Sequence, residues 1–161
     1  MPRFARESVS PALDVPAGSG LEERRNAHIV AGVTRGVPLL QFDTTRSLSA
    51  EERTGLAERV TALYAEEMET TTGHVAVTIR ERDPSAMHLG REVEGPLLFL
   101  DAEIRRGRPF ERKRAFALET MAYAGDALEI PDENMKVVFT EHEGEAMMGV
   151  DRVGGEWDGE A

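Results

Sequence analysis

The chain has 161 residues, enough for one domain, and 40% of them are hydrophobic, so a real core can form. The absence of cysteine excludes disulfides, thiolate metal sites and cysteine nucleophiles. A net charge of −11 argues against nucleic acid as a partner, because phosphate binding calls for a basic surface. No apolar run approaches the ~20 residues of a membrane helix, and no signal peptide is visible. We therefore expect a cytoplasmic protein without membrane contact.

The basic residues are almost all arginine. Lys113 and Lys136 are the only lysines among 19 basic residues. An acidic surface poor in lysine suits a halophilic organism with an acidic proteome, because strong salt screening makes a high surface charge tolerable. GC-rich coding combined with an ordinary acidic surface is the alternative explanation.

The first 37 residues differ from the rest. Proline and glycine interrupt them repeatedly, and their apolar residues follow no sustained period. The composition predicts a leader over residues 1–37 that is either disordered or never translated, with a weak helical signal at 21–30. One domain is then expected over residues 38–161.

The first half of that domain begins with a short apolar strand at 38–43. A helix is expected over 49–68, because Ser49 and Glu52 have the spacing of a capping box and apolar residues follow at helical intervals. A strand rich in β-branched residues follows at 75–80.

The second half repeats this order. A strand at 97–103 resembles the first one, and a helix over 109–127 begins with Pro109 as its expected first residue. The last long strand is predicted at 135–140. Tyr64 and Tyr123 fall at matching places in the two helices.

A β-α-β unit that occurs twice predicts the fold class. Each crossover helix implies a parallel strand pair, so we expect an α+β two-layer sandwich, with a four-stranded mixed sheet and two helices on one face. The second face of the sheet is left without a cover. Self-association would cover it, which predicts a homo-oligomer.

Three sequence features, in this order along the chain, resemble the tautomerase superfamily. These are the proline-led strand at Pro38, the segment Arg105-Arg106-Gly107-Arg108 before the second helix, and Thr140-Glu141 followed by glycines. The superfamily includes 4-oxalocrotonate tautomerase, malonate semialdehyde decarboxylase and cis-3-chloroacrylic acid dehalogenase. The resemblance implies a homotrimer that needs no cofactor and no metal.

The resemblance also implies a chemistry. Members use the amine of an N-terminal proline as acid and base, which makes Pro38 the catalytic candidate. Arg105 and Arg108 match an arginine pair that binds the substrate carboxylate. Tyr64 roughly matches the place of a helix histidine in the dehalogenase, which makes it a third candidate for substrate binding. The expected function is keto–enol tautomerisation of a small 2-oxo acid, and we lean towards an enzyme, an isomerase.

Related activities of the superfamily fit less well. Val138 and Gly149 stand where the dehalogenase has a tyrosine and a glutamate, which disfavours a hydratase or dehalogenase. The segment Thr72-Gly73-His74 lacks the aspartate of the decarboxylase, which disfavours decarboxylation.

Pro38 poses a chemical problem, because it follows Val37 and its nitrogen is an amide without basicity. Three explanations stay open: the leader is cleaved, translation starts at codon 37 and the initiator methionine is removed, or the activity has been lost. In the last case the protein is a non-catalytic homo-oligomeric scaffold or binding module with the same fold. Pro38 would then only start a strand, Arg105 and Arg108 would be solvated, and Tyr64 would be a core residue. Pro2 is a poor candidate, because the strand after it is charged.

Overall fold

The computed structural model describes residues 37–150, 152 and 153. The predicted short helix at 21–30 lies outside the described residues, as does all of the leader except Val37. The long elements are β1 (Leu39–Thr44), α2 (Ala50–Glu67), β2 (Ala76–Glu81), β3 (Leu98–Arg105), α3 (Phe110–Leu128) and β4 (Met135–His142). Each lies within two residues of its predicted bounds, which confirms the repeated strand–helix–strand pattern.

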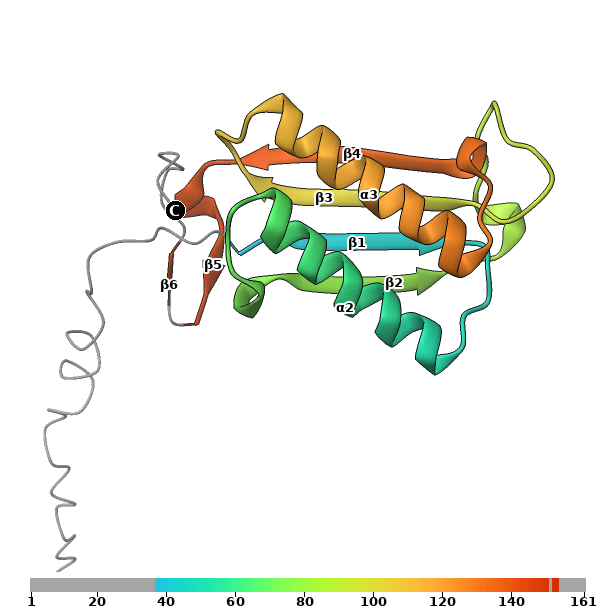
Figure 1. Cartoon of the computed structure of the whole chain (residues 1–161), viewed down its shortest axis with the longest axis horizontal. Helices are drawn as coiled ribbons and strands as arrows, with labels where there is room; N and C mark the ends of the chain where they lie inside the picture. Colours follow the sequence, from blue (N-terminus) through green and yellow to red (C-terminus); the bar gives the residue numbers. More distant parts are fainter. Residues whose placement is uncertain (1–36, 151, 154–161) are drawn as a thin grey trace, which may run out of the picture. The chain divides into compact units, whose positions relative to one another are not determined.

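These strands form one mixed sheet. Its order is β2-β1-β3-β4, in which β1 and β2 are parallel, β3 and β4 are parallel, and the central pair β1 and β3 is antiparallel. Helices α2 and α3 lie side by side over the same face of the sheet (Figure 1). The predicted two-layer α+β sandwich is therefore confirmed.

Helix α2 begins as its sequence predicts. The Ser49 hydroxyl accepts a hydrogen bond from the Glu52 backbone N–H, and the Glu52 carboxylate accepts one from the Ser49 N–H at 2.7 Å. Both bonds satisfy donors that the first turn of a helix leaves unpaired. Further along, α2 buries Leu56, Val60, Leu63 and Tyr64 against the sheet.

Helix α3 begins one residue later than predicted. Pro109 is the N-cap and not the first helical residue, because its ψ of 151° is extended although its φ of −56° fits a helix. The ring of proline fixes φ alone and leaves ψ to the turn that precedes the helix. That turn passes through Gly107, whose φ of 106° favours glycine.

The core lies between the helices and one face of the sheet. Strand alternation places Leu40 and Phe42 of β1, and Leu98, Leu100 and Ala102 of β3, on that face, where all are buried. Tyr64, Phe116 and Phe139 continue the core as two edge-to-face aromatic contacts, with ring centroids 5.4 Å and 6.3 Å apart.

The opposite face of the sheet, here called the open face, carries the alternate residues of each strand. Leu39, Gln41, Asp43, Phe99 and Asp101 lie there and are half-buried. The face therefore mixes apolar and charged side chains.

A short ribbon follows β4. It consists of β5 (Met148–Gly149) and β6 (Arg152–Val153), which pair antiparallel. The described residues also form 3-10 turns at Thr72–His74, Pro84–Ala86, Asp132–Asn134 and Gly144–Ala146. None of the helices in the described part of the chain has the length and hydropathy to cross a membrane.

Candidate functional site

The start of β1 and the end of β3 lie at the same end of the sheet. Pro38 directly precedes β1, is buried, and accepts a hydrogen bond from the Ala76 N–H at 3.0 Å. Leu39 pairs with Glu103 in the antiparallel register, so one step further Pro38 lies across from Ile104. The next residue of β3 is Arg105, its last. The topology thus brings Pro38 and the predicted arginine segment to one end of the molecule.

Arg108 is 4% exposed and links the start of α3 to the end of α2. Its Nε donates a hydrogen bond to the Met68 carbonyl oxygen at 3.2 Å, and its Nη1 donates to the Arg105 carbonyl oxygen at 3.5 Å. Arg112, one turn further, donates to the Glu67 carbonyl oxygen at 3.0 Å. Guanidinium groups at this place also interact favourably with the negative end of the α2 dipole.

Tyr64 lies beside these arginines. Its side chain is buried, and the Arg108 Cζ atom is 5.9 Å from the centre of its ring, a cation–π contact. Burial raises the pKa of the Tyr64 hydroxyl, while the charges of Arg108 and Arg105 act in the opposite direction. The hydroxyl is therefore protonated at neutral pH and can act as a donor. The structure brings Tyr64 and both arginines together, and Tyr64 is also a core residue.

The two arginines form a positive centre within the protein. Arg105 is 2% exposed, so neither it nor Arg108 is a solvated surface residue, and that alternative is wrong for both. Two guanidinium groups close together are a common means of recognising a carboxylate through charge-assisted hydrogen bonds. This arrangement can bind a carboxylate and can stabilise an enolate oxygen.

The same end of the sheet carries a pair that the sequence did not reveal. His142 lies opposite Arg105 in the β3–β4 register, and its Nε2 contacts the Glu103 carboxylate. The two residues are 39 positions apart, so a search for histidine partners at helical spacing could not find them. The alternation of β4 was the available signal, since it places His142 and Thr140 on the same face. Among the described residues, no group of three His, Asp or Glu side chains could hold a metal ion.

Comparison with known proteins gave matches among solved structures. No family model matches the chain, and no curated protein matches it. A member of the cis-3-chloroacrylic acid dehalogenase family, called N1, superposes with a TM-score of 0.67 at 24% identity, over 73% of this chain and 84% of that one.

Two other structures extend the likeness. A fused 4-OT that forms a symmetric trimer superposes with a TM-score of 0.61 at 18% identity, over 70% of this chain and 92% of that one. Macrophage migration inhibitory factor of Toxoplasma gondii superposes with a TM-score of 0.64 at 15% identity, over 71% of this chain and 98% of that one. At such identities the likeness concerns the fold, and it agrees with the strand order and the helix layer described above. The chain therefore has the fold of the tautomerase superfamily.

Proposed function

We propose that the protein is a keto–enol tautomerase of a small 2-oxo acid and that the amine of Pro38, once N-terminal, is its acid and base. The observation that carries this proposal is that Pro38, Arg105 and Arg108 lie at the same end of the sheet, with Arg108 beside Tyr64. It supplies a nitrogen that can become a base next to two groups that bind an anion.

The geometry suits proton transfer next to a carbonyl. A free α-amine has a pKa of ~8, and burial near guanidinium groups lowers it towards neutrality, because both penalise the charged form. The neutral amine takes the proton from the enol hydroxyl, and the protonated amine then donates it to the carbon next to the carbonyl. Arg105 and Arg108 bind the carboxylate and stabilise the enolate oxygen between these steps.

The mechanism requires that the Val37–Pro38 bond is absent from the active form. Cleavage of the leader would expose the Pro38 amine. Translation from codon 37 with removal of the initiator methionine would expose it as well. The fold tolerates this change in its sheet, because β1 begins at Leu39 and Pro38 contributes only its carbonyl to the pairing with β2. An intact leader instead favours the non-catalytic scaffold, because the proline nitrogen is then acylated.

We also propose that the protein self-associates, as a homotrimer. Two observations support this: both long helices of the described residues lie over the other face of the sheet and none lies over the open face (Figure 1), and fused 4-OT proteins of the same fold are trimers.

The decisive experiment compares a chain that begins at Pro38 with the 161-residue chain, using phenylenolpyruvate as substrate. We expect the shorter chain to be faster by ~100-fold or more, the usual contribution of a positioned base. Acetylation of its terminal amine should abolish turnover, and Pro38→Ala should lower the rate without abolishing it, since a primary amine remains. Equal activity of the two chains would rule out the proline mechanism. Inactivity of both against several 2-oxo acids would favour the scaffold.

A further inference from the structure

The C-terminal end of α2 carries a glutamate at a position where helices usually have glycine. Glu69 has a φ of 47°, in the left-handed region that favours glycine. Its N–H donates to the Glu66 carbonyl oxygen at 3.3 Å. The Thr70 N–H donates to the Ala65 carbonyl oxygen at 3.0 Å, which completes a Schellman motif. A side chain in this conformation costs free energy, so we expect it to make a compensating contact.

The side chain of Glu69 makes that contact with α3. Its carboxylate forms an ion pair with the Arg112 guanidinium group, whose Nη1 also donates to the Glu67 carbonyl oxygen at 3.0 Å. One guanidinium group thus joins a backbone carbonyl and a carboxylate on either side of Met68. The two side chains of the ion pair are 30% and 39% exposed, so the pair adds little to stability and its main effect is on geometry.

The backbone between these two contacts holds a residue of the candidate site. The Met68 carbonyl oxygen accepts a buried hydrogen bond from the Arg108 Nε at 3.2 Å. The same guanidinium group lies 5.9 Å from the centre of the Tyr64 ring. The direction of the Met68 carbonyl therefore helps to set the position of the Arg108 guanidinium group. A displacement of a binding group by ~1 Å can lower a rate by as much as ~100-fold.

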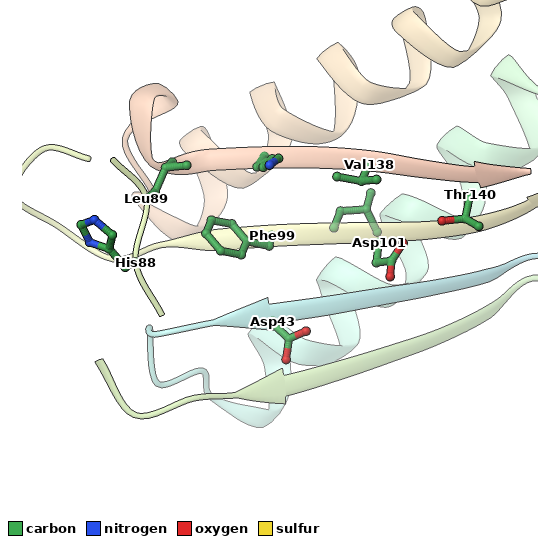
Figure 2. Close-up of a pocket in the computed structure, with 9 residues that line it drawn as sticks. Asp43, His88, Leu89, Phe99, Asp101, Val138 and Thr140 are labelled. Carbon is green, nitrogen blue, oxygen red and sulfur yellow. The ribbon is translucent and has the colours of Figure 1, made fainter. Parts of the chain in front are cut away.

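We propose that Glu69 and Arg112 are positioning residues of the candidate site, which hold Arg108 in place through the Met68 carbonyl. This inference rests on the proposed function, in which Arg108 binds the substrate carboxylate. Both residues act from the helix layer, which lies behind the sheet when the open face is in view (Figure 2). Their substitution should therefore leave the open face, and with it the proposed self-association, unchanged.

The end of the other helix provides a matched control. Helix α3 also ends at a glutamate in the left-handed region, Glu129 with a φ of 52°, and its carboxylate pairs with Arg46 at 3.4 Å. This pair lies at the opposite end of the sheet from Pro38. Glycine at either position relieves backbone strain and removes an ion pair. The two glycine variants therefore differ in the link to Arg108.

Steady-state kinetics of the chain that begins at Pro38 test the effect on activity. Glu69→Gly should lower kcat/KM for phenylenolpyruvate by ~10-fold, because Arg108 is then held less precisely. Glu129→Gly should leave kcat/KM unchanged. Urea titration should show that both variants are at least as stable as the parent chain, since glycine suits the left-handed conformation. An equal loss of activity in the two variants would point to a general structural effect and overturn the positioning role.

A second measurement does not depend on turnover. In the 161-residue chain the buried Nε–H of Arg108 should give a slowly exchanging signal in nitrogen-correlated NMR spectra, assigned by its loss in Arg108→Lys. Glu69→Gly should speed its exchange with solvent by on the order of 10-fold, as expected for a local loss of protection, and Glu129→Gly should not.

The two measurements separate the possible failures. Exchange as slow in Glu69→Gly as in the parent would overturn the positioning role, whatever the activity. Faster exchange with unchanged kcat/KM would overturn it as well, because the position of Arg108 would then not matter for the reaction. Inactivity of the parent chain would count against the proposed function, and the exchange rates would still decide whether Glu69 holds Arg108.

Discussion

The first strand-to-helix turn joins β1 to α2, and the second joins β3 to α3. The two turns occupy equivalent places in the repeat, but they differ in how the helix start is stabilised. In the first, Ser49 caps α2 with a complete capping box and Arg46 pairs with Glu52 at 2.7 Å. In the second, Pro109 caps α3 without any side-chain hydrogen bond, and Arg108 is buried next to it. The turn that carries the candidate site therefore lacks the local helix-start stabilisation that its counterpart has. Such local departures from the best helix signals are typical of functional positions.

The antiparallel pairing of β1 and β3 places the two turns at opposite ends of the sheet. Changes in the first turn are thus remote from Pro38 and leave the candidate site intact. The first turn provides matched controls for the second, and the comparison can be tested residue by residue.

The largest effect is expected at the second turn. In the chain that begins at Pro38, Arg105→Ala or Arg108→Ala should lower kcat/KM by ~100-fold or more, since removal of one electrostatic donor costs about 3 kcal/mol. Arg46→Ala is the matched control in the first turn and should leave the activity unchanged. Steady-state kinetics with phenylenolpyruvate measure both. Full activity in both variants of the second turn would show that these guanidinium groups are structural.

Loss of the first-turn cap should affect stability and not activity. Ser49→Ala removes the hydroxyl that accepts the Glu52 N–H, and we expect the free energy of unfolding to fall by ~1 kcal/mol. Urea titration followed by circular dichroism measures the change. Ser47→Ala serves as the control, because it removes only an exposed bond of 3.3 Å to Glu81. Equal effects of the two variants would mean that the capping box contributes little.

The first turn should also make stability depend on acid pH. Hydrogen bonds from Arg53 and from the Leu48 N–H lower the pKa of Glu81 below its ordinary value of 4.5. A lowered folded pKa means that this carboxylate stabilises the fold above pH ~4.5 and that the contribution is lost as pH falls through the folded pKa. The difference in unfolding free energy between the parent and Glu81→Gln should therefore vanish at low pH. A difference that persists at pH 2 would contradict the assignment.

The smallest effect concerns the place where the two helices meet. A Cβ atom on Gly55 of α2 would lie 3.2 Å from the Tyr123 hydroxyl of α3. Gly55→Ala should raise the free energy of unfolding by less than the ~1 kcal/mol that helix propensity alone would add, because Tyr123 must shift. In a Tyr123→Phe background the full gain should appear. A double-mutant cycle of unfolding free energies measures this coupling, and additivity would show that the helices do not touch there.

The sequence was sufficient for the local structure and insufficient for the long-range contacts. The capping box of Ser49 and Glu52 could be predicted, because both partners lie within one helical turn. The bond from Arg108 to the Met68 carbonyl and the contact of His142 with Glu103 could not, since they join residues about 40 positions apart. The predicted start of α3 is one residue too early, because proline is compatible with both the N-cap and the first helical position. The conformation of the preceding turn decides which of the two Pro109 occupies.

The same limit applies to the candidate site. The resemblance brought Pro38, Arg105 and Arg108 into one hypothesis, and the register of β1 and β3 shows why they are near one another. Periodicity placed Tyr64 on the apolar face of its helix, but it could not show that the ring also lies under the Arg108 guanidinium group. The buried Oδ1 atom of Asp101 cannot be predicted from the sequence, because an oxygen without a hydrogen-bond donor among the described residues is a property of the folded sheet.

The central position of β1 has a consequence for synthesis on the ribosome. Residues 39–81 contain a complete β-α-β unit, in which β1 is paired with β2 along one edge. Its other edge, which includes the backbone of Leu40 and Phe42, has no partner until β3 has been made and has left the exit tunnel. At translation rates of ~5–20 residues per second, this interval is on the order of seconds. An unpaired strand edge is a template for pairing with other chains, so the nascent first half exposes an aggregation-prone edge until β3 pairs with β1.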